Sequence, residues 1–109
     1  ATGTSNNDLV EGQFFRKYFL NVPVFGTKAY TGHTLGAAGS LEIIWGCLCF
    51  LNNFIPKTLG FEQVDPDIKL TPTTEVMPYQ GSFFLSTSLG FGGANSAIIL
   101  ERYIEGGNC

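Results

Sequence analysis

The chain has 109 residues, of which 44% are hydrophobic and 14% aromatic, enough for one hydrophobic core and too few for two. We therefore expect a single domain, or part of one, over residues 1–109. Six basic and nine acidic residues give a formal charge of −3. Because a nucleic-acid-binding surface needs a basic excess, nucleic acid is not an expected partner.

The first predicted element is a helix that ends near Phe19. Asn6, Asn7 and Asp8 suit helix caps, and Glu11 would lie in the first turn. Apolar side chains then recur at helical spacing, at Leu9, Val10, Phe14, Phe15 and Tyr18. Since Ala1 is followed at once by turn-forming residues, we expect the chain to begin inside a motif.

The helical pattern breaks at Asn21 and Pro23, and the run from Val22 to Thr27 predicts a short strand that enters a loop. Residues 28–33 are expected on that loop. Taken alone, a lysine and a histidine beside a glycine-rich turn are typical of an ordinary surface, so these residues indicate a site only in combination with other motifs.

A second helix is predicted from about Thr34, where small residues give way to apolar ones, to Asn52 and Asn53. It is apolar on nearly every face, which predicts burial between layers. The apolar stretch approaches the length of a membrane span, but Glu42 lies in its middle and glycines interrupt it. We interpret it as a buried helix and expect no membrane span.

The rest of the chain predicts a surface loop and then a hairpin. Residues 54–81 hold four prolines and should follow the surface, with room for a small edge strand. Two strand-like runs, 83–89 and 96–102, flank the glycine-rich turn at 90–95 and predict an antiparallel hairpin. Helices alternating with strands indicate an α/β layered fold, in which two or three strands make an incomplete sheet.

The cysteines and glycine clusters exclude other classes of site. Cys47, Cys49 and Cys109 are odd in number, and two lie inside an apolar run, so a reducing, cytoplasmic setting without disulfides is expected. Neither glycine cluster has the lysine ending of a phosphate loop or the helix start of a dinucleotide site. No metal site is expected.

Three segments together resemble, in order and spacing, the C-terminal motifs of the β-ketoacyl synthases. They are TGTSNNDLVE at 2–11, KAYTGHTLGAAGSLE at 28–42 and SLGFGGAN at 88–95. The resemblance implies the C-terminal part of a thiolase-like α/β layered fold, a mixed sheet packed by helices with a C-terminal antiparallel hairpin. It also implies a partial domain that lacks its first strand and N-terminal half. The family's nucleophilic cysteine and first catalytic histidine would precede Ala1.

The resemblance implies a decarboxylative Claisen condensation of an acyl-enzyme with malonyl-carrier protein. His33 matches the family histidine that stabilises the charge developing on the malonyl thioester oxygen during decarboxylation. Lys28 matches a lysine that supports the charge balance near that histidine. Asp8 and Glu11 match acids that approach this lysine, although ordinary acids of a helix N-terminus explain them equally well.

Four further residues match binding positions of the family. Thr2 and Thr4 match hydroxyl residues that contact the phosphopantetheine arm of the carrier. Phe91 matches a loop residue whose N–H belongs to the oxyanion hole and whose ring gates the acyl pocket. Glu42 matches a buried acid behind the active site, and a carboxylate in so apolar a helix needs a partner or a raised pKa.

Two departures and several alternatives accompany the resemblance. Leu89 stands where many members have phenylalanine and Ala94 where threonine is common, so acyl preference is open. Thiolases share the glycine–histidine motif, but they lack a lysine at the position of Lys28 and need a C-terminal cysteine. Two other hypotheses remain for this chain. It could be a non-catalytic partner subunit like a chain-length factor, or a natural truncated product.

The resemblance also implies partners. Acyl carrier protein would deliver the substrates on phosphopantetheine, with no further cofactor. The intact enzyme would be a homodimer that includes the missing N-terminal half. We expect the isolated chain to be inactive without a nucleophilic cysteine, and to self-associate through its uncovered helix and sheet edge.

Overall fold

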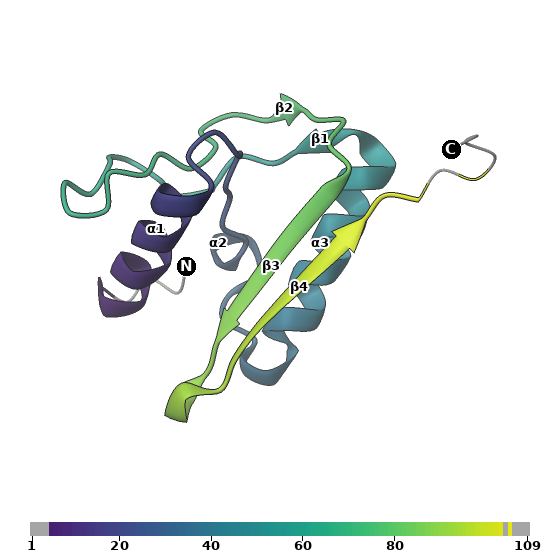
Figure 1. Ribbon diagram of the computed structural model, residues 1–109. Coiled ribbons are helices and arrows are strands. Elements are labelled where there is room, and N and C mark those ends of the chain that lie inside the picture. The colour runs from purple at the N-terminus through teal and green to yellow at the C-terminus, as the bar shows by residue number, and fades with distance from the viewer. Residues whose placement is uncertain (1–4, 104, 106–109) are drawn as a thin grey trace. The chain divides into compact units, whose positions relative to one another are not determined.

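The computed structural model describes residues 5–103 and 105 (Figure 1). The chain divides into two compact units. Unit 1 consists of Ala1–Leu35 and Ile55–Met77, and unit 2 of Gly36–Phe54 and Pro78–Cys109. The single partial domain expected from the sequence stays a prediction.

Unit 1 begins with helix α1, Ser5–Tyr18, which confirms the first predicted helix. Asn6, Asn7 and Asp8 lie inside this helix, so the expectation that they cap it is wrong. The Asn7 side-chain amide donates a hydrogen bond of 3.0 Å to a carboxylate oxygen of Glu11, one turn further on. A side chain that is satisfied by its i+4 neighbour belongs to the helix surface rather than to its cap.

Helix α1 is held by ring contacts and by a close approach to a loop. The ring of Phe14 lies 5.2 Å from that of Tyr18 and 5.8 Å from that of Phe19, in tilted orientations. Gly12 is buried, and a Cβ atom at this position would overlap the side chain of Ile68. The helix therefore packs on the loop through a position where only glycine fits.

The strand predicted over residues 22–27 is wrong. This segment is irregular, and its hydrogen bonds are single tertiary contacts rather than a ladder. The carbonyl of Val24 accepts from the amide of Thr73 at 2.8 Å, and the amide of Gly26 donates to Thr58 Oγ1 at 3.2 Å. Pro23, near the start of this segment, has no N–H to donate to a ladder.

The predicted loop after residue 27 contains a short helix, α2, Lys28–Thr31, which corrects that part of the prediction. The carbonyl of the buried Thr27 accepts from the amide of Tyr30 at 2.9 Å. Gly32 ends the helix with φ +73°, and its amide donates to the carbonyl of Lys28 at 2.7 Å. Glycine suits this position because a positive φ carries little steric penalty for it.

Residues 56–76 form the expected surface loop. Its anchor is Thr73, which is buried and donates from its hydroxyl to the carbonyl of Pro56 at 2.8 Å. The amide of Thr58 returns a bond of 2.7 Å to the carbonyl of Thr73. Strands β1, Phe54–Ile55, and β2, Met77–Pro78, pair in a two-stranded sheet at the ends of this loop, so the small predicted strand is present.

In unit 2 the long apolar helix is α3, Ala38–Asn52, which follows a 3₁₀ turn η1, Leu35–Ala37. It ends as predicted, because Asn53 adopts a left-handed conformation with φ +55°. Within α3 the buried residues are Gly46 and Cys49. The expected burial on nearly every face is therefore not observed, since in unit 2 strand β3 packs along one side of the helix.

The stretch Leu35–Asn52 is long and apolar enough, by length and composition, to cross a membrane. It has 18 residues with a mean hydropathy of 1.4, and 11% of it is buried. Glu42 lies within it and has a hydrogen-bonding partner on β3. Packing against a strand through a carboxylate agrees with a helix of a layered fold.

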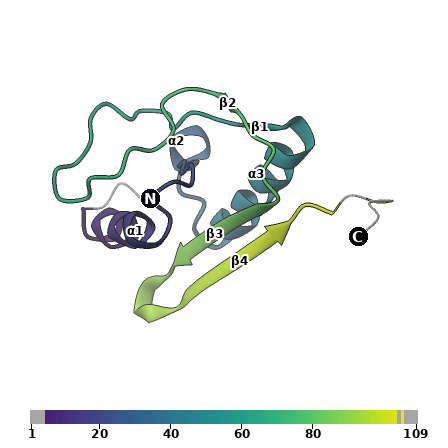
Figure 2. The ribbon, with the colours of Figure 1, turned by 45° about the horizontal axis from the view of Figure 1, so that its top comes forward.

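The predicted hairpin is confirmed. Strands β3, Phe83–Leu89, and β4, Asn95–Glu101, pair antiparallel from Phe83 opposite Glu101 to Leu89 opposite Asn95. A 3₁₀ turn η2, Phe91–Gly93, forms the tip. Figures 1 and 2 show α3 running along one side of this hairpin.

The contact between α3 and β3 combines the period of a helix with that of a strand. Helix residues at successive spacings of three and four positions lie against every second residue of the strand. The pairs are Gly39 with Ser88, Glu42 with Ser86, and Gly46 with Phe84. The residue number rises along α3 while it falls along β3, so the two elements run antiparallel. This row of contacts is called the α3–β3 seam.

Apolar side chains also occupy the surfaces of unit 2 away from the seam. Because side chains alternate between the faces of a strand, Phe83 and Ile99 lie on the other face of the hairpin, where they are 58% and 67% exposed. On α3, Leu51 is 77% exposed. A sheet that is apolar on both faces is typical of a layer covered on both sides, which agrees with the predicted α/β layered fold.

Candidate functional site

The predicted site residues are distributed over both units. Thr2 and Thr4 lie outside the described residues, so their predicted contacts stay predictions. The others lie in unit 1 (Asp8, Glu11, Lys28 and His33) and in unit 2 (Glu42 and Phe91).

His33 lies in a tight turn directly after α2. Gly32 before it has φ +73° and ψ 176°, a conformation open to glycine, and Leu35 after it has φ +54°. This turn brings the backbone amide of Leu35 to 3.1 Å from His33 Nδ1, to which it donates a hydrogen bond. The imidazole ring is exposed in this chain. The sequence analysis did not identify the role of Leu35, because the donor is a backbone N–H, which does not depend on the type of side chain.

The bond from Leu35 determines which ring nitrogen of His33 can donate. Since Nδ1 accepts a hydrogen bond, the neutral ring carries its hydrogen on Nε2. Nε2 lies on the opposite side of the ring from the backbone. The turn therefore presents an N–H donor outward, which is the arrangement needed to stabilise negative charge on a bound oxygen.

Lys28 is the first residue of α2 and is half-buried. The same short helix is tied to the neighbouring loop by Tyr30, whose hydroxyl donates to the carbonyl of Lys57 at 2.6 Å. One helical turn and Gly32 separate Lys28 from His33, and the whole segment lies in unit 1. The backbone thus holds the cation and the imidazole on one anchored segment.

Asp8 and Glu11 lie in the first half of α1, and both are half-buried. Glu11 accepts the hydrogen bond from Asn7 described above. Their three-residue spacing places the two carboxylates on neighbouring positions of the helix surface, as predicted. Their predicted approach to Lys28 stays a prediction.

Glu42 has the partner that its apolar surroundings require. Its carboxylate accepts a hydrogen bond of 2.8 Å from the hydroxyl of Ser86 on β3, and Ser86 is 8% exposed. Bonds between a hydroxyl and a carboxylate are among the stronger hydrogen bonds in proteins. The sequence analysis did not identify Ser86 as this partner. The alternation of side chains along a strand could have indicated it, because it places the polar residues 86 and 88 on the same face of β3, toward α3.

The tip of the hairpin has an unusual backbone. Gly92 and Gly93 have φ +75° and +81°, and the amide of Gly90 donates to the carbonyl of Ala94 at 2.8 Å. Phe91 lies in η2 between Gly90 and Gly92. The tip therefore depends on glycine for its conformation, and its backbone is the part of the predicted Phe91 site that can be described.

The two cysteines of α3 differ from a catalytic nucleophile. Cys49 is 3% exposed, and burial raises the pKa of its thiol. Cys47 is exposed on the same helix. Since the thiolate is the reactive form, a raised pKa makes Cys49 a poor nucleophile. Within residues 5–103 and 105, no group of three His, Cys, Asp or Glu residues could hold a metal ion.

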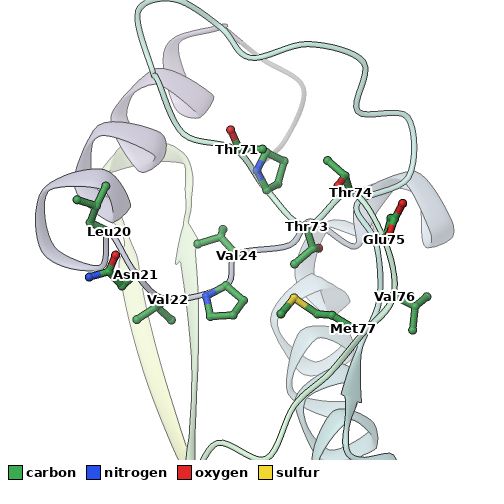
Figure 3. A pocket seen from close by; sticks show the side chains of 12 residues that line it. Leu20, Asn21, Val22, Val24, Thr71, Thr73, Thr74, Glu75, Val76 and Met77 are labelled. Atoms are coloured by element: carbon green, nitrogen blue, oxygen red, sulfur yellow. The ribbon is translucent and has the colours of Figure 1, made fainter.

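Unit 1 also contains an open cavity of about 470 Å³ between residues 20–24 and 71–77 (Figure 3). Its walls combine apolar side chains such as Val22 and Met77 with hydroxyl side chains such as Thr71 and Thr74. None of the predicted site residues lines this cavity. The cavity and the turn around His33 therefore share no residue.

Known proteins resemble this chain over most of its length. Residues 1–62 match the family described as "Beta-ketoacyl synthase, C-terminal domain". The chain is 37% identical over 110 residues to the 3-oxoacyl-[acyl-carrier-protein] synthase 1 of Buchnera aphidicola subsp. Acyrthosiphon pisum, covering 94% of this chain and 26% of that protein.

Two synthases 2 are similar to a comparable degree. The 3-oxoacyl-[acyl-carrier-protein] synthase 2 of Mycobacterium bovis is 38% identical over 106 residues, with 94% of this chain and 25% of that protein covered. That of Coxiella burnetii is 34% identical over 111 residues, with 96% and 27% covered. The chain thus spans about a quarter of the length of the curated relatives it matches.

Proposed function

The chain belongs to the β-ketoacyl synthase family, as its C-terminal domain, and from this premise we propose that the enzyme it helps to form is a 3-oxoacyl-[acyl-carrier-protein] synthase. In the proposed reaction an acyl group is first transferred from its carrier to a cysteine. Malonyl-carrier protein then loses carbon dioxide, and the resulting enolate attacks the acyl-cysteine thioester. The cysteine thiolate leaves, and the β-ketoacyl chain is two carbons longer.

The orientation of the His33 ring is the observation that supports this proposal most directly. Because Leu35 donates to Nδ1, the Nε2–H of the neutral ring is available to the malonyl thioester oxygen. Negative charge develops on that oxygen as carbon dioxide leaves, and one positioned donor typically contributes about a hundredfold to a thousandfold in rate. The ring is exposed in this chain, so the rest of the enzyme would have to exclude water from it.

Lys28 would contribute charge rather than a proton. The cation would support the charge balance at the malonyl site, on the same anchored segment as the imidazole. Asp8 and Glu11 would balance the charge of this lysine and hold it in place.

The remaining matched residues would bind substrate or support the site. Thr2 and Thr4 would donate to the phosphopantetheine arm, and the backbone N–H of Phe91 would form part of the oxyanion hole, with its ring at the acyl pocket. Glu42 would act from behind through its contact with Ser86. Phosphopantetheine on the carrier would be the sole prosthetic group involved.

The partners follow from the same reaction. Acyl carrier protein would deliver both substrates, in the cytoplasm, and the N-terminal half of a homodimeric enzyme would supply the nucleophilic cysteine. Cys49, a buried thiol with a raised pKa, is unsuited to that role. The chain alone should therefore form no β-ketoacyl product.

A chimeric synthase tests the proposal. The last quarter of the Buchnera enzyme would be replaced by this chain, and release of carbon dioxide from malonyl-carrier protein would be measured separately from condensation. We expect His33→Ala to lower the decarboxylation rate about a hundredfold or more. His33→Gln, whose amide can still donate near the position of Nε2, should retain part of the rate.

The controls separate the proposed role from a folding defect. Circular dichroism spectra of the chimera and its variants should be the same, and acylation of the cysteine should survive His33→Ala. Unchanged decarboxylation in the folded His33→Ala chimera would refute the role of this histidine. A folded chimera that accepts acyl groups but never condenses would favour a non-catalytic subunit like a chain-length factor.

A further inference from the structure

Ser86 is the buried polar residue of unit 2 within the described part of the chain. Its hydroxyl crosses from β3 to α3 and donates to the Glu42 carboxylate at 2.8 Å. The contacts on either side of it in the α3–β3 seam, at Gly39 and Gly46, are close packing against glycine. The Ser86–Glu42 bond is thus a directional polar contact in this row.

Ser86 lies close in sequence to the hairpin tip. Strand β3 continues from Ser86 only to Leu89, and the tip begins at Gly90. Within the tip, the amide of Gly90 bonds to the carbonyl of Ala94 at 2.8 Å. Because the tip follows β3 directly at Gly90, the direction of the tip depends on how firmly the end of β3 is held.

The other end of the hairpin has its own anchor. The amide of Arg102 donates to the carbonyl of Ser82 at 2.7 Å, and the guanidinium of Arg102 donates to Asn53 Oδ1 at 2.6 Å. The Arg102 guanidinium also lies 5.0 Å from the ring centre of Phe50 on α3. Arg102 at the open end and Ser86 toward the tip thus each attach the hairpin to the end of α3 or to its side through hydrogen bonds, in addition to the close packing of the seam.

We propose that Ser86 is a positioning residue, which holds the glycine-rich tip in place through its hydrogen bond to Glu42. This inference rests on the proposed function for the importance of the tip, because the Phe91 N–H is the proposed oxyanion donor. Loss of the Ser86 hydroxyl removes this donor from the carboxylate and weakens the attachment of the end of β3 to α3, while the pairing of β3 with β4 remains. The tip then moves, while the open end stays fixed by Arg102.

Amide hydrogen exchange in the 109-residue chain tests the positioning directly. We expect Ser86→Ala to accelerate exchange of the Gly90 amide about tenfold to a hundredfold, as for the loss of a hydrogen bond to a charged group. Exchange of the Arg102 amide should change much less. Ser96→Ala, an exposed serine on β4, is the matched control and should change neither amide.

Conservative variants separate positioning from general loss of structure. Ser86→Thr keeps the hydroxyl and should restore slow exchange at Gly90. Glu42→Gln keeps the size and an acceptor, and should accelerate Gly90 less than Ser86→Ala does. Equal acceleration at Gly90 and Arg102, or no acceleration at Gly90, would overturn the inference, and so would a Ser86→Thr variant that behaves like alanine.

A kinetic readout in the chimeric synthase tests what the tip does. Ser86→Ala should lower kcat with little change in KM for malonyl-carrier protein, since the oxyanion donor acts mainly in the transition state. If exchange at Gly90 rises but kcat is unchanged, the positioning by Ser86 stands and the proposed role of the tip fails. If exchange does not rise, the positioning fails whatever the chimera does.

Discussion

Gly46 offers a sharp test of the packing between α3 and β3. Alanine is usually preferred over glycine inside a helix by about 1 kcal/mol. At Gly46, however, a Cβ atom would lie 2.5 Å from Cδ1 and 2.8 Å from Cγ of Phe84. Cγ is next to the strand backbone, so rotating the ring cannot clear it, and such overpacking costs about 1–3 kcal/mol. We expect Gly46→Ala to lower the free energy of unfolding of unit 2 by about 1 kcal/mol.

Urea unfolding followed by fluorescence measures this change. Trp45 is the single tryptophan of the chain and lies on α3, so its signal reports the helix under test. Gly36→Ala is the control, because no atom lies within 4 Å of its Cβ position, and it should change stability by less than about 0.5 kcal/mol.

A second background identifies the cause. When Phe84 is shortened to leucine, Gly46→Ala should become neutral or stabilising by up to about 1 kcal/mol, with a coupling energy of about 1–3 kcal/mol between the two sites. If Gly46→Ala stabilises the chain in both backgrounds, helix propensity alone decides the outcome. The argument from close packing would then be wrong.

Two further predictions concern the cysteines of α3 and the turn before His33. A thiol reagent should label the exposed Cys47 under native conditions and reach the buried Cys49 only after unfolding, as mass spectrometry of digested protein would show. Because burial raises the pKa of the Cys49 thiol above 9.0, its stabilising contribution is complete below the unfolded pKa and is lost as pH rises through the folded pKa. The difference in urea midpoint between the wild type and Cys49→Ala should therefore shrink above pH 9.0, and a constant difference would contradict this. Gly32→Ala should destabilise the chain by about 1–3 kcal/mol, because φ +73° with ψ 176° strains any residue with a Cβ; an unchanged urea midpoint would contradict the turn geometry.

The regular elements with a strong periodic pattern could be predicted from the sequence, and those set by tertiary contacts could not. Helices α1 and α3 and the β3–β4 hairpin follow from apolar periodicity and from the glycines of the tip. The segment at 22–27 has the composition of a strand, but its partners are single bonds to distant residues, such as Thr73. The helix α2 has four residues, too few for a periodic signal.

The candidate site could be predicted in its residue types but not in its orientation. The motif around His33 identified the histidine, whereas the donor from Leu35 that selects Nε2 depends on two positive φ angles. The need of Glu42 for a partner was evident from its apolar helix. That the partner is Ser86, 44 residues away, depends on the register of a helix against a strand, which no local pattern contains.

The fit of Gly46 against the Phe84 ring also limits how this sequence can change over generations. A larger residue at position 46 costs less stability once the ring opposite it has become smaller, because the Cβ and the ring would occupy the same space. The two positions should therefore change together among related sequences, with small opposite large in either order. In such a pair the order of substitution matters. Shortening the aromatic side chain first avoids the overlap that enlarging residue 46 first would cause.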